Sequence, residues 1–378
     1  MGLTHPSTPL AAIARGLVTV AVLVGLGAVP SAQGAEPILN TGAPVVAGDP
    51  VYRERLTATP GTWSPEPVAV DYQWLRDGAP IPDATTAAYR TDLDDLGRRL
   101  AVSVVATDST GAQAFAVSAA TGQVARADLT VEDRPVAGGV PRYTRILTAA
   151  APRLRPRADV VRYRWLRDDR PVAGARGRTH RLGVEDVGHR LRVQATVRRE
   201  GYRTKRLLSR SRTVLHLAPL RRTVTYHVET RGAVTANLVE FRRQAQETFD
   251  DARGWRATGT AFRQVRRGGD FTLVLAVARA VPGFSSSCSA TWSCRVGRYV
   301  IINQTRWATA SPAWNAARRS LRDYRHLVVN HETGHWLGHG HLGCSGSGPA
   351  PVMMQQSQGT GGCSFNPWPL PSERWVRR

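Results

Sequence analysis

The sequence predicts a multidomain protein in which two all-β sandwiches precede a domain of α/β (α+β) type. Three observations support this fold class. The chain has 378 residues, more than one ordinary hydrophobic core accommodates. A segment of ~90 residues occurs twice, and such self-similarity marks a repeated module. After the second copy the apolar residues follow helical as well as strand-like spacing.

The first segment, residues 1–35, has the pattern of a signal peptide. The run from Gly16 to Val29 is apolar apart from Thr19, and small residues follow as far as Ala35. An uncleaved membrane anchor is the alternative, although the run is shorter than the ~20 residues that span a bilayer. No second hydrophobic segment follows, so we expect no transmembrane segment beyond the signal and a secreted or cell-surface protein.

Two modules follow, over residues 37–126 and 127–217. The segment Tyr72–Asp77 (YQWLRD) returns as Tyr163–Asp168 (YRWLRD), and the offset of 91 positions is kept further downstream without a gap. We therefore expect both copies to have the same fold.

Within a module, apolar residues alternate, as at Leu100, Val102 and Val104, and turn formers separate the runs. This alternation indicates short strands in a half-buried antiparallel sheet. The central Tyr-x-Trp strand resembles that of the immunoglobulin-like (Ig-like) modules of bacterial cell-surface proteins, which implies that Trp74 and Trp165 fill the core between two sheets. Neither copy contains a Cys, so the intersheet disulfide of antibody domains is excluded.

The third domain is expected over residues 218–378, after a basic linker at 206–222. Its pattern changes from strands alone to strands mixed with helices, which indicates an α/β domain. The expected elements are a strand at 224–228, a helix at 236–253, strands at 271–277 and 299–303, and a helix at 321–337.

A metal-binding pattern occupies the end of the last expected helix. His331 and His335 are four residues apart, so on a helix both rings project from one face and can reach one ion. Gly338 can adopt positive φ and end the helix, which lets His341 supply a third ligand. Three imidazoles suit Zn²⁺ and leave a coordination position open, as in catalytic zinc sites. Glu332, directly after the first ligand, is the expected catalytic base. A polar histidine-rich loop, or a site that binds metal without catalysis, is the alternative.

The extended pattern His-Glu-x-x-His-x-x-Gly-x-x-His resembles that of the metzincin zinc proteases, which also have a methionine-containing turn below the metal. The resemblance implies that Met353 forms this turn, with Met354 almost equally suitable. It also implies a zinc-bound water activated by Glu332 and a substrate peptide along an edge strand, for which Val300–Thr305 is the candidate. Residues 218–378 also resemble an actinobacterial secreted family of uncharacterised function.

All four cysteines lie in this domain, at Cys288, Cys294, Cys344 and Cys363. An exported protein with an even number of cysteines favours disulfides, and three pairings are formally possible. We favour Cys288 with Cys294 and Cys344 with Cys363, since each pair closes a loop rich in Ser or Gly. Metal ligation by these cysteines is the alternative, but no Cys-x-x-Cys spacing is present.

The net charge is +22, and Lys205 is the only lysine. A basic surface attracts anionic cell-wall polymers, which we expect as partners beside a peptide or protein substrate. The arginines are spread along the chain without a recognisable nucleic-acid motif, so no specific nucleic acid is expected. The leading hypothesis is a secreted zinc-dependent metalloendopeptidase. A non-catalytic metal-binding adhesin and a zinc amidase acting on cell-wall peptide are the alternatives.

Overall fold

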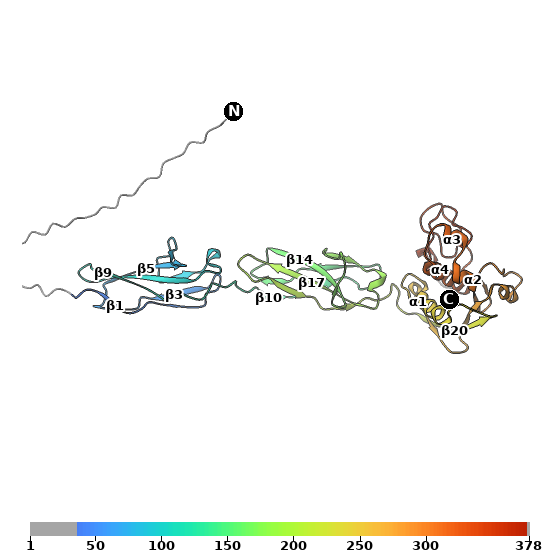
Figure 1. Cartoon of the computed structure of the whole chain (residues 1–378), viewed down its shortest axis with the longest axis horizontal. Coiled ribbons are helices and arrows are strands. Elements are labelled where there is room, and N and C mark those ends of the chain that lie inside the picture. The colour runs from blue at the N-terminus through green and yellow to red at the C-terminus, as the bar shows by residue number, and fades with distance from the viewer. Residues whose placement is uncertain (1–35, 376–378) are drawn as a thin grey trace, which may run out of the picture. The chain divides into compact units, whose positions relative to one another are not determined.

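The computed structural model of the chain describes residues 36–375, shown in Figure 1. The expected signal peptide, residues 1–35, lies outside the described residues. The chain divides after Ala125 into two compact units. No helix within residues 36–375 is long and apolar enough to cross a membrane.

The first unit is an all-β module with two main antiparallel sheets. One sheet has the order β2-β3-β7 and the other β6-β5-β8-β9, while β1 pairs with β4. Its elements are β1 (Leu39–Gly42), β2 (Val45–Ala47), β3 (Arg55–Thr59), β4 (Thr62–Ser64), β5 (Ala69–Arg76), β6 (Ala79–Pro80), β7 (Ala88–Arg90), the 3₁₀ turn η1 (Leu93–Asp95), β8 (Leu100–Thr107) and β9 (Gln113–Val117).

The core of this module lies between the two sheets, which makes it a sandwich. Leu56 on β3 packs in one cluster with Trp74 on β5 and with Leu100 and Val102 on β8, and all four are fully buried. Trp74 pairs with Val102 across the two strands, so the alternation seen in the sequence sends these side chains to the same face. The predicted role of Trp74 in core packing is confirmed.

The second unit begins with the other copy of the module. Its sheets have the orders β11-β12-β16 and β15-β14-β17-β18, β19 also pairs with β17, and β10 pairs with β13. Trp165 is fully buried between them. Its elements are β10 (Thr130–Asp133), β11 (Val136–Gly138), β12 (Ile146–Ala150), β13 (Arg153–Arg155), β14 (Val160–Arg167), β15 (Arg170–Pro171), β16 (Thr179–Arg181), η2 (Val184–Asp186), β17 (Arg190–Arg198), β18 (Lys205–Leu208) and β19 (Arg212–Thr213).

The expected linker at 206–222 is wrong over its first half. Strands β18 and β19 occupy this basic stretch and pair with β17. Leu207 is buried, whereas its neighbour Arg206 is exposed. Buried and exposed residues therefore alternate in this stretch, as in a strand. The sequence pattern did not show this because arginines greatly outnumber the few apolar residues that face the core.

The rest of the second unit has the predicted α/β character. A five-stranded sheet has the order β21-β20-β22-β24-β23, in which only β23 runs antiparallel to its neighbour. The strands are β20 (Arg222–Arg231), β21 (Thr260–Gln264), β22 (Phe271–Ala276), β23 (Cys294–Val296) and β24 (Tyr299–Asn303). The helices are α1 (Leu238–Asp250), α2 (Gln304–Thr309), α3 (Pro312–Ala316) and α4 (Leu321–Trp336), with 3₁₀ segments η3 (Trp255–Thr258), η4 (Ala278–Phe284) and η5 (Pro371–Glu373).

The expected edge strand Val300–Thr305 is wrong. Its first part is β24, which lies between β22 and β23 and is buried, and the chain then turns into α2. The edge is instead β23, a three-residue strand joined to β24 by a short hairpin. The sequence concealed this strand because it is short and contains only one aliphatic side chain, that of Val296.

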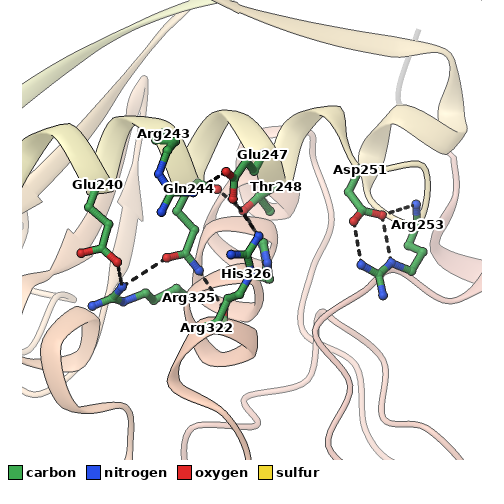
Figure 2. A network of polar contacts seen from close by, with 10 residues as sticks. All are labelled: Glu240, Arg243, Gln244, Glu247, Thr248, Asp251, Arg253, Arg322, Arg325 and His326. Carbon is green, nitrogen blue, oxygen red and sulfur yellow. Dashed lines mark hydrogen bonds and ion pairs between the residues drawn. The ribbon is translucent and has the colours of Figure 1, made fainter. Parts of the chain in front are cut away.

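Polar contacts fix helix α4 against α1, as Figure 2 shows. Arg325 donates to Glu240, and Arg322 pairs with Glu247. Thr248 donates its hydroxyl proton to the carbonyl of Gln244, so its oxygen accepts from Nδ1–H of His326 at 2.8 Å. These contacts hold α4, the helix that carries the metal-binding pattern.

Candidate metal centre

The three predicted histidines converge at the end of α4. His331 and His335 lie one turn apart on the helix, which ends at Trp336. Gly338 has φ of 100°, a conformation that glycine adopts without steric cost, and the chain turns back there. His341 then returns to the helix, and one ring nitrogen of each histidine lies within 4.8 Å of the others.

The ring nitrogens face each other closely. Nε2 of His335 lies 3.2 Å from Nε2 of His331 and 3.0 Å from Nε2 of His341. The other nitrogen of two rings is already committed: Nδ1 of His331 lies 2.8 Å from the carbonyl oxygen of Val352, and Nδ1 of His335 lies 2.9 Å from that of His339. A carbonyl only accepts, so each Nδ1 bears the proton and each Nε2 presents a lone pair. His331 and His335 therefore cannot hydrogen-bond to each other through these atoms.

The surroundings keep the rings neutral. Burial, with the neighbouring His335 acting in the same direction, lowers the pKa of His331 to about 3. Burial is also the main cause that lowers the pKa of His335 and of His341. Neutral imidazole is the form that ligates metals.

The donor set fits a zinc ion. Tetrahedral Zn–N bonds of ~2.0–2.1 Å place ligand nitrogens about 3.3 Å apart, close to the Nε2 separations of the three histidines. Backbone carbonyls that accept from the remote ring nitrogens are the usual outer partners of metal-bound histidines. His331, His335 and His341 are thus the residues that would hold the ion, with a position left open.

Glu332 lies in the cavity beside these rings. Its side chain is 6% exposed and, with the three histidines, lines a hollow of about 340 Å³. Burial raises the pKa of Glu332 to about 8, although the positive charge of Arg295 opposes this rise. A divalent cation at the histidines would favour the ionised carboxylate.

Met353, rather than Met354, is the methionine under the helix. Met353 is fully buried, and a Cβ added to Gly334 would lie 2.3 Å from its sulfur and 2.8 Å from Trp255. Gly334, inside the metal-binding pattern, is therefore the position that lets Met353 approach the helix backbone. Met354 instead lines the cavity.

Both favoured disulfides are formed. Cys288 is bonded to Cys294, and this pair contributes to the cavity wall. Cys344 is bonded to Cys363, and the loop that it closes contains Met353. No cysteine among the described residues is free, so the alternative of cysteine ligands is excluded.

Two residues near the centre were not singled out by the sequence pattern. Arg295 on β23 lines the cavity and donates to the carbonyl of His335 at 2.9 Å. His339 is buried, its ring stacks on Trp255 and contacts Trp375, and its carbonyl accepts from His335. A lone Arg on a three-residue strand gives no sequence signal, whereas His339 falls outside the three-ligand pattern and was expected either to support the site or to be exposed; it is buried and supports the site.

Comparison with known proteins gives one family match. Residues 200–371 match the family described as "Protein of unknown function (DUF3152)". No curated protein matches the chain. The earlier resemblance to metzincins is therefore wrong as a family assignment, because the matching family has no known function and no match supports a protease family. That resemblance depended on eleven residues and a methionine, which determine the arrangement around a metal but not the family of a whole domain.

Several solved structures of proteins with consecutive domains also match at low scores. Three N-terminal domains of the Hoc protein of bacteriophage RB49 share 14% identity over 51% of this chain and 65% of that one, with a TM-score of 0.23. Tandem Ig repeats of Dlar share 12% identity over 45% and 96%, at 0.15. Sidekick-1 immunoglobulin domains 1–5 share 18% over 53% and 44%, at 0.20. At such scores the likeness carries no argument, and the sandwich architecture follows from the strand pairing itself.

Proposed function

We propose that residues 218–378 form a zinc-dependent hydrolase of peptide bonds. One observation carries the proposal: the Nε2 atoms of three histidines converge beside a buried glutamate, and two of these rings, His331 and His335, have their proton on Nδ1 and so present a lone pair. Facing lone pairs repel one another unless a cation lies between them. A fold that maintains this arrangement is therefore arranged for a metal ion.

The residues around the centre suit hydrolysis. A bound zinc ion supplies a Lewis acid and lowers the pKa of water. Glu332 accepts a proton from a water molecule in the cavity as the oxygen of that water forms a bond to the substrate carbonyl carbon. Glu332 then delivers this proton to the amine nitrogen as the carbon–nitrogen bond breaks. Mere metal binding has no need of this carboxylate, so its presence argues against the adhesin alternative.

The edge strand and the residues that line the cavity support a peptide as substrate. The edge strand β23 contributes Arg295 to the cavity wall, and an extended peptide can add to such an edge through backbone hydrogen bonds. The remaining lining side chains are mainly neutral serines and glutamines. Arg295, beside Glu332, is suited to a carbonyl or carboxylate of the substrate.

The environment of the enzyme follows from its cysteines. Two disulfides persist in oxidising compartments, which supports a secreted or cell-surface protein. The two sandwiches would then act as spacers or attach the hydrolase to anionic cell-wall polymers.

The test uses the full chain and three variants. Wild type should bind one zinc per chain and cleave members of a peptide library that includes cell-wall peptides. Glu332→Gln should retain zinc and lose about 10²–10⁴-fold in rate, because it removes only the base. His331→Ala should lose the metal. Glu200→Gln, on an exposed residue of the second sandwich, is the matched control and should behave as wild type.

Two outcomes would contradict the proposal. A zinc-loaded wild type that cleaves no peptide would exclude the activity. Equal loss of zinc and rate in Glu332→Gln would show that this residue is a ligand and not a base.

A further inference from the structure

Near the C-terminus, a buried carboxylate lies behind the metal centre. Glu373 ends the 3₁₀ segment η5 and is 0% exposed. Its oxygens accept three backbone N–H groups: Oε1 that of Met353 at 2.9 Å, and Oε2 those of Val352 at 3.0 Å and Leu370 at 2.7 Å. Among the salt bridges of the described residues none involves Glu373. Backbone dipoles are thus its hydrogen-bonding partners.

One of these contacts connects Glu373 to His331. The N–H of Met353 and the C=O of Val352 belong to the same peptide group. Its N–H donates to Glu373, while its C=O accepts from Nδ1 of His331 at 2.8 Å. The peptide group therefore joins the carboxylate to the ring in one chain of hydrogen bonds.

We propose that Glu373 is a positioning residue that orients His331 for the metal through the Val352–Met353 peptide. A negative charge on the N–H side of a peptide polarises the group and makes its carbonyl oxygen a stronger acceptor. The stronger bond to Nδ1–H fixes the ring and raises the electron density at Nε2, as a directly bound carboxylate does in many zinc sites. The inference rests on the proposed function only in that the three histidines bind a metal.

The position of Glu373 in the sequence agrees with a dedicated role. It is the only acidic residue after Glu332, in a stretch that also contains three arginines and no lysine. Burying a carboxylate without a cation costs free energy, and the three backbone N–H groups that donate to Glu373 offset part of that cost. The other reading is that Glu373 only caps the η5 turn through the N–H of Leu370.

Two variants distinguish the positioning role from the capping role. Leu370 has φ of −65°, the value that proline requires, so Leu370→Pro deletes the capping N–H without changing the backbone angle. The bonds from Glu373 to Val352 and Met353 remain. Glu373→Gln keeps the shape of the side chain and removes the charge that polarises the peptide.

The experiment uses the full chain with Zn²⁺ and Co²⁺ as probes. We measure affinity by competition with a chelator, the visible absorption of the Co²⁺ form, and thermal unfolding without metal. Glu373→Gln should weaken affinity about 10–100-fold and alter the Co²⁺ spectrum, whereas Leu370→Pro should lower thermal stability and leave both unchanged. If Glu373→Gln does not fold, Glu373→Asp, which keeps the charge but withdraws it from the peptide, should also weaken affinity.

The outcomes distinguish this inference from the proposed function. Wild-type affinity and spectrum in Glu373→Gln, or in Glu373→Asp if only that variant folds, would overturn the positioning role. Equal losses of affinity in Glu373→Gln and Leu370→Pro would also overturn it, in favour of capping. A wild type that binds both ions but hydrolyses nothing would refute the hydrolase and leave the positioning test valid. A wild type that binds neither ion would overturn both.

Discussion

Buried polar groups have hydrogen-bonding partners of opposite charge in the sandwich modules but not at the candidate metal centre. In the second sandwich, Asp186 is 1% exposed and every oxygen has a partner: Arg167 donates to Oδ1, and the Gly183 amide and His180 contact Oδ2. Burial by itself would raise the pKa of Asp186, but these hydrogen bonds outweigh it and lower the pKa to about 2. At the candidate metal centre, Nε2 atoms of His331, His335 and His341 face one another, and no carboxylate of the described residues pairs with them.

The first sandwich repeats the paired arrangement at equivalent positions. Asp95 accepts from Arg76, from the hydroxyl of Tyr89 and from the Asp92 amide. Each of these residues has its counterpart 91 positions later in the second copy, where His180 stands in place of Tyr89. A buried charge that serves the fold is thus fully paired, whereas buried groups arranged for a ligand are left for the ligand to satisfy.

The largest effect should come from breaking a paired site. Asp186→Ala leaves Arg167 without its buried partner and should destabilise the second sandwich by about 3–5 kcal/mol. His335→Ala, measured with a metal chelator present, should cost less than about 1 kcal/mol, because it removes one hydrogen bond together with the facing lone pairs. Denaturant unfolding with hydrogen exchange, which assigns each loss to its domain, checks both.

Asp168→Ala is the matched control for the paired site. Asp168 contacts His189 and the Arg190 amide at the end of the same sheet, but its side chain is about half exposed. Exposed ion pairs contribute little, so this variant should cost about 1 kcal/mol or less. If Asp186→Ala cost no more than Asp168→Ala, the distinction between paired and unpaired burial would fail.

Acid should lower the stability of the second unit more than that of the first. Burial lowers the pKa of His326 to about 4, and the charge of Arg322 acts in the same direction, whereas Asp251 and Asp323 oppose it and Arg253 supports it. The folded state favours the neutral ring, so its stability is complete above pH ~6.5 and falls as the pH approaches 4. At 1.36 kcal/mol per pH unit the loss is about 3 kcal/mol.

The control for this prediction lies in the chain itself. Residues 36–125 contain no histidine, so the first sandwich should show no loss of stability from histidine protonation in this range. His326→Phe retains an aromatic ring against Trp368 and should remove the share of the pH dependence that His326 contributes, while the buried histidines of the candidate metal centre, whose pKa values are also lowered, keep the rest. Unfolding measured between pH 7 and pH 4 would contradict the assignment if this variant titrated like wild type.

The sequence predicted the parts of this molecule that depend on local spacing. The repeated modules, both long helices and the two disulfide pairs follow from period, composition and distance along the chain. It missed what depends on distant packing: β23, identified only by its pairing with β24, and Glu373, which meets Val352 and Met353 only after the chain folds back. The three histidines of the candidate metal centre could be predicted from the sequence because helix geometry and one glycine turn bring them together.

The smallest expected effect tests how closely the methionine supports the helix. Alanine stabilises a helix interior relative to glycine by about 1 kcal/mol, so Gly334→Ala would be favourable if the site were open. The new Cβ, however, would overlap the sulfur of Met353 at 2.3 Å and approach Trp255 at 2.8 Å, and such overpacking costs about 1–3 kcal/mol. We expect Gly334→Ala to lower the free energy of unfolding by about 1 kcal/mol and to change the absorption spectrum of the Co²⁺ form.

A double variant decides whether Met353 causes that loss. Met353→Ala alone should destabilise the domain by leaving a cavity, but Gly334→Ala added to it should be neutral or stabilising, because the overlapping sulfur is gone. The coupling between the two substitutions is therefore predicted to be favourable. Strict additivity would mean that Met353 moves aside without cost. The methionine would then fill space beneath the helix without fixing the position of the helix. The orientation of His331 and His335 would depend on the backbone carbonyls of Val352 and His339 alone.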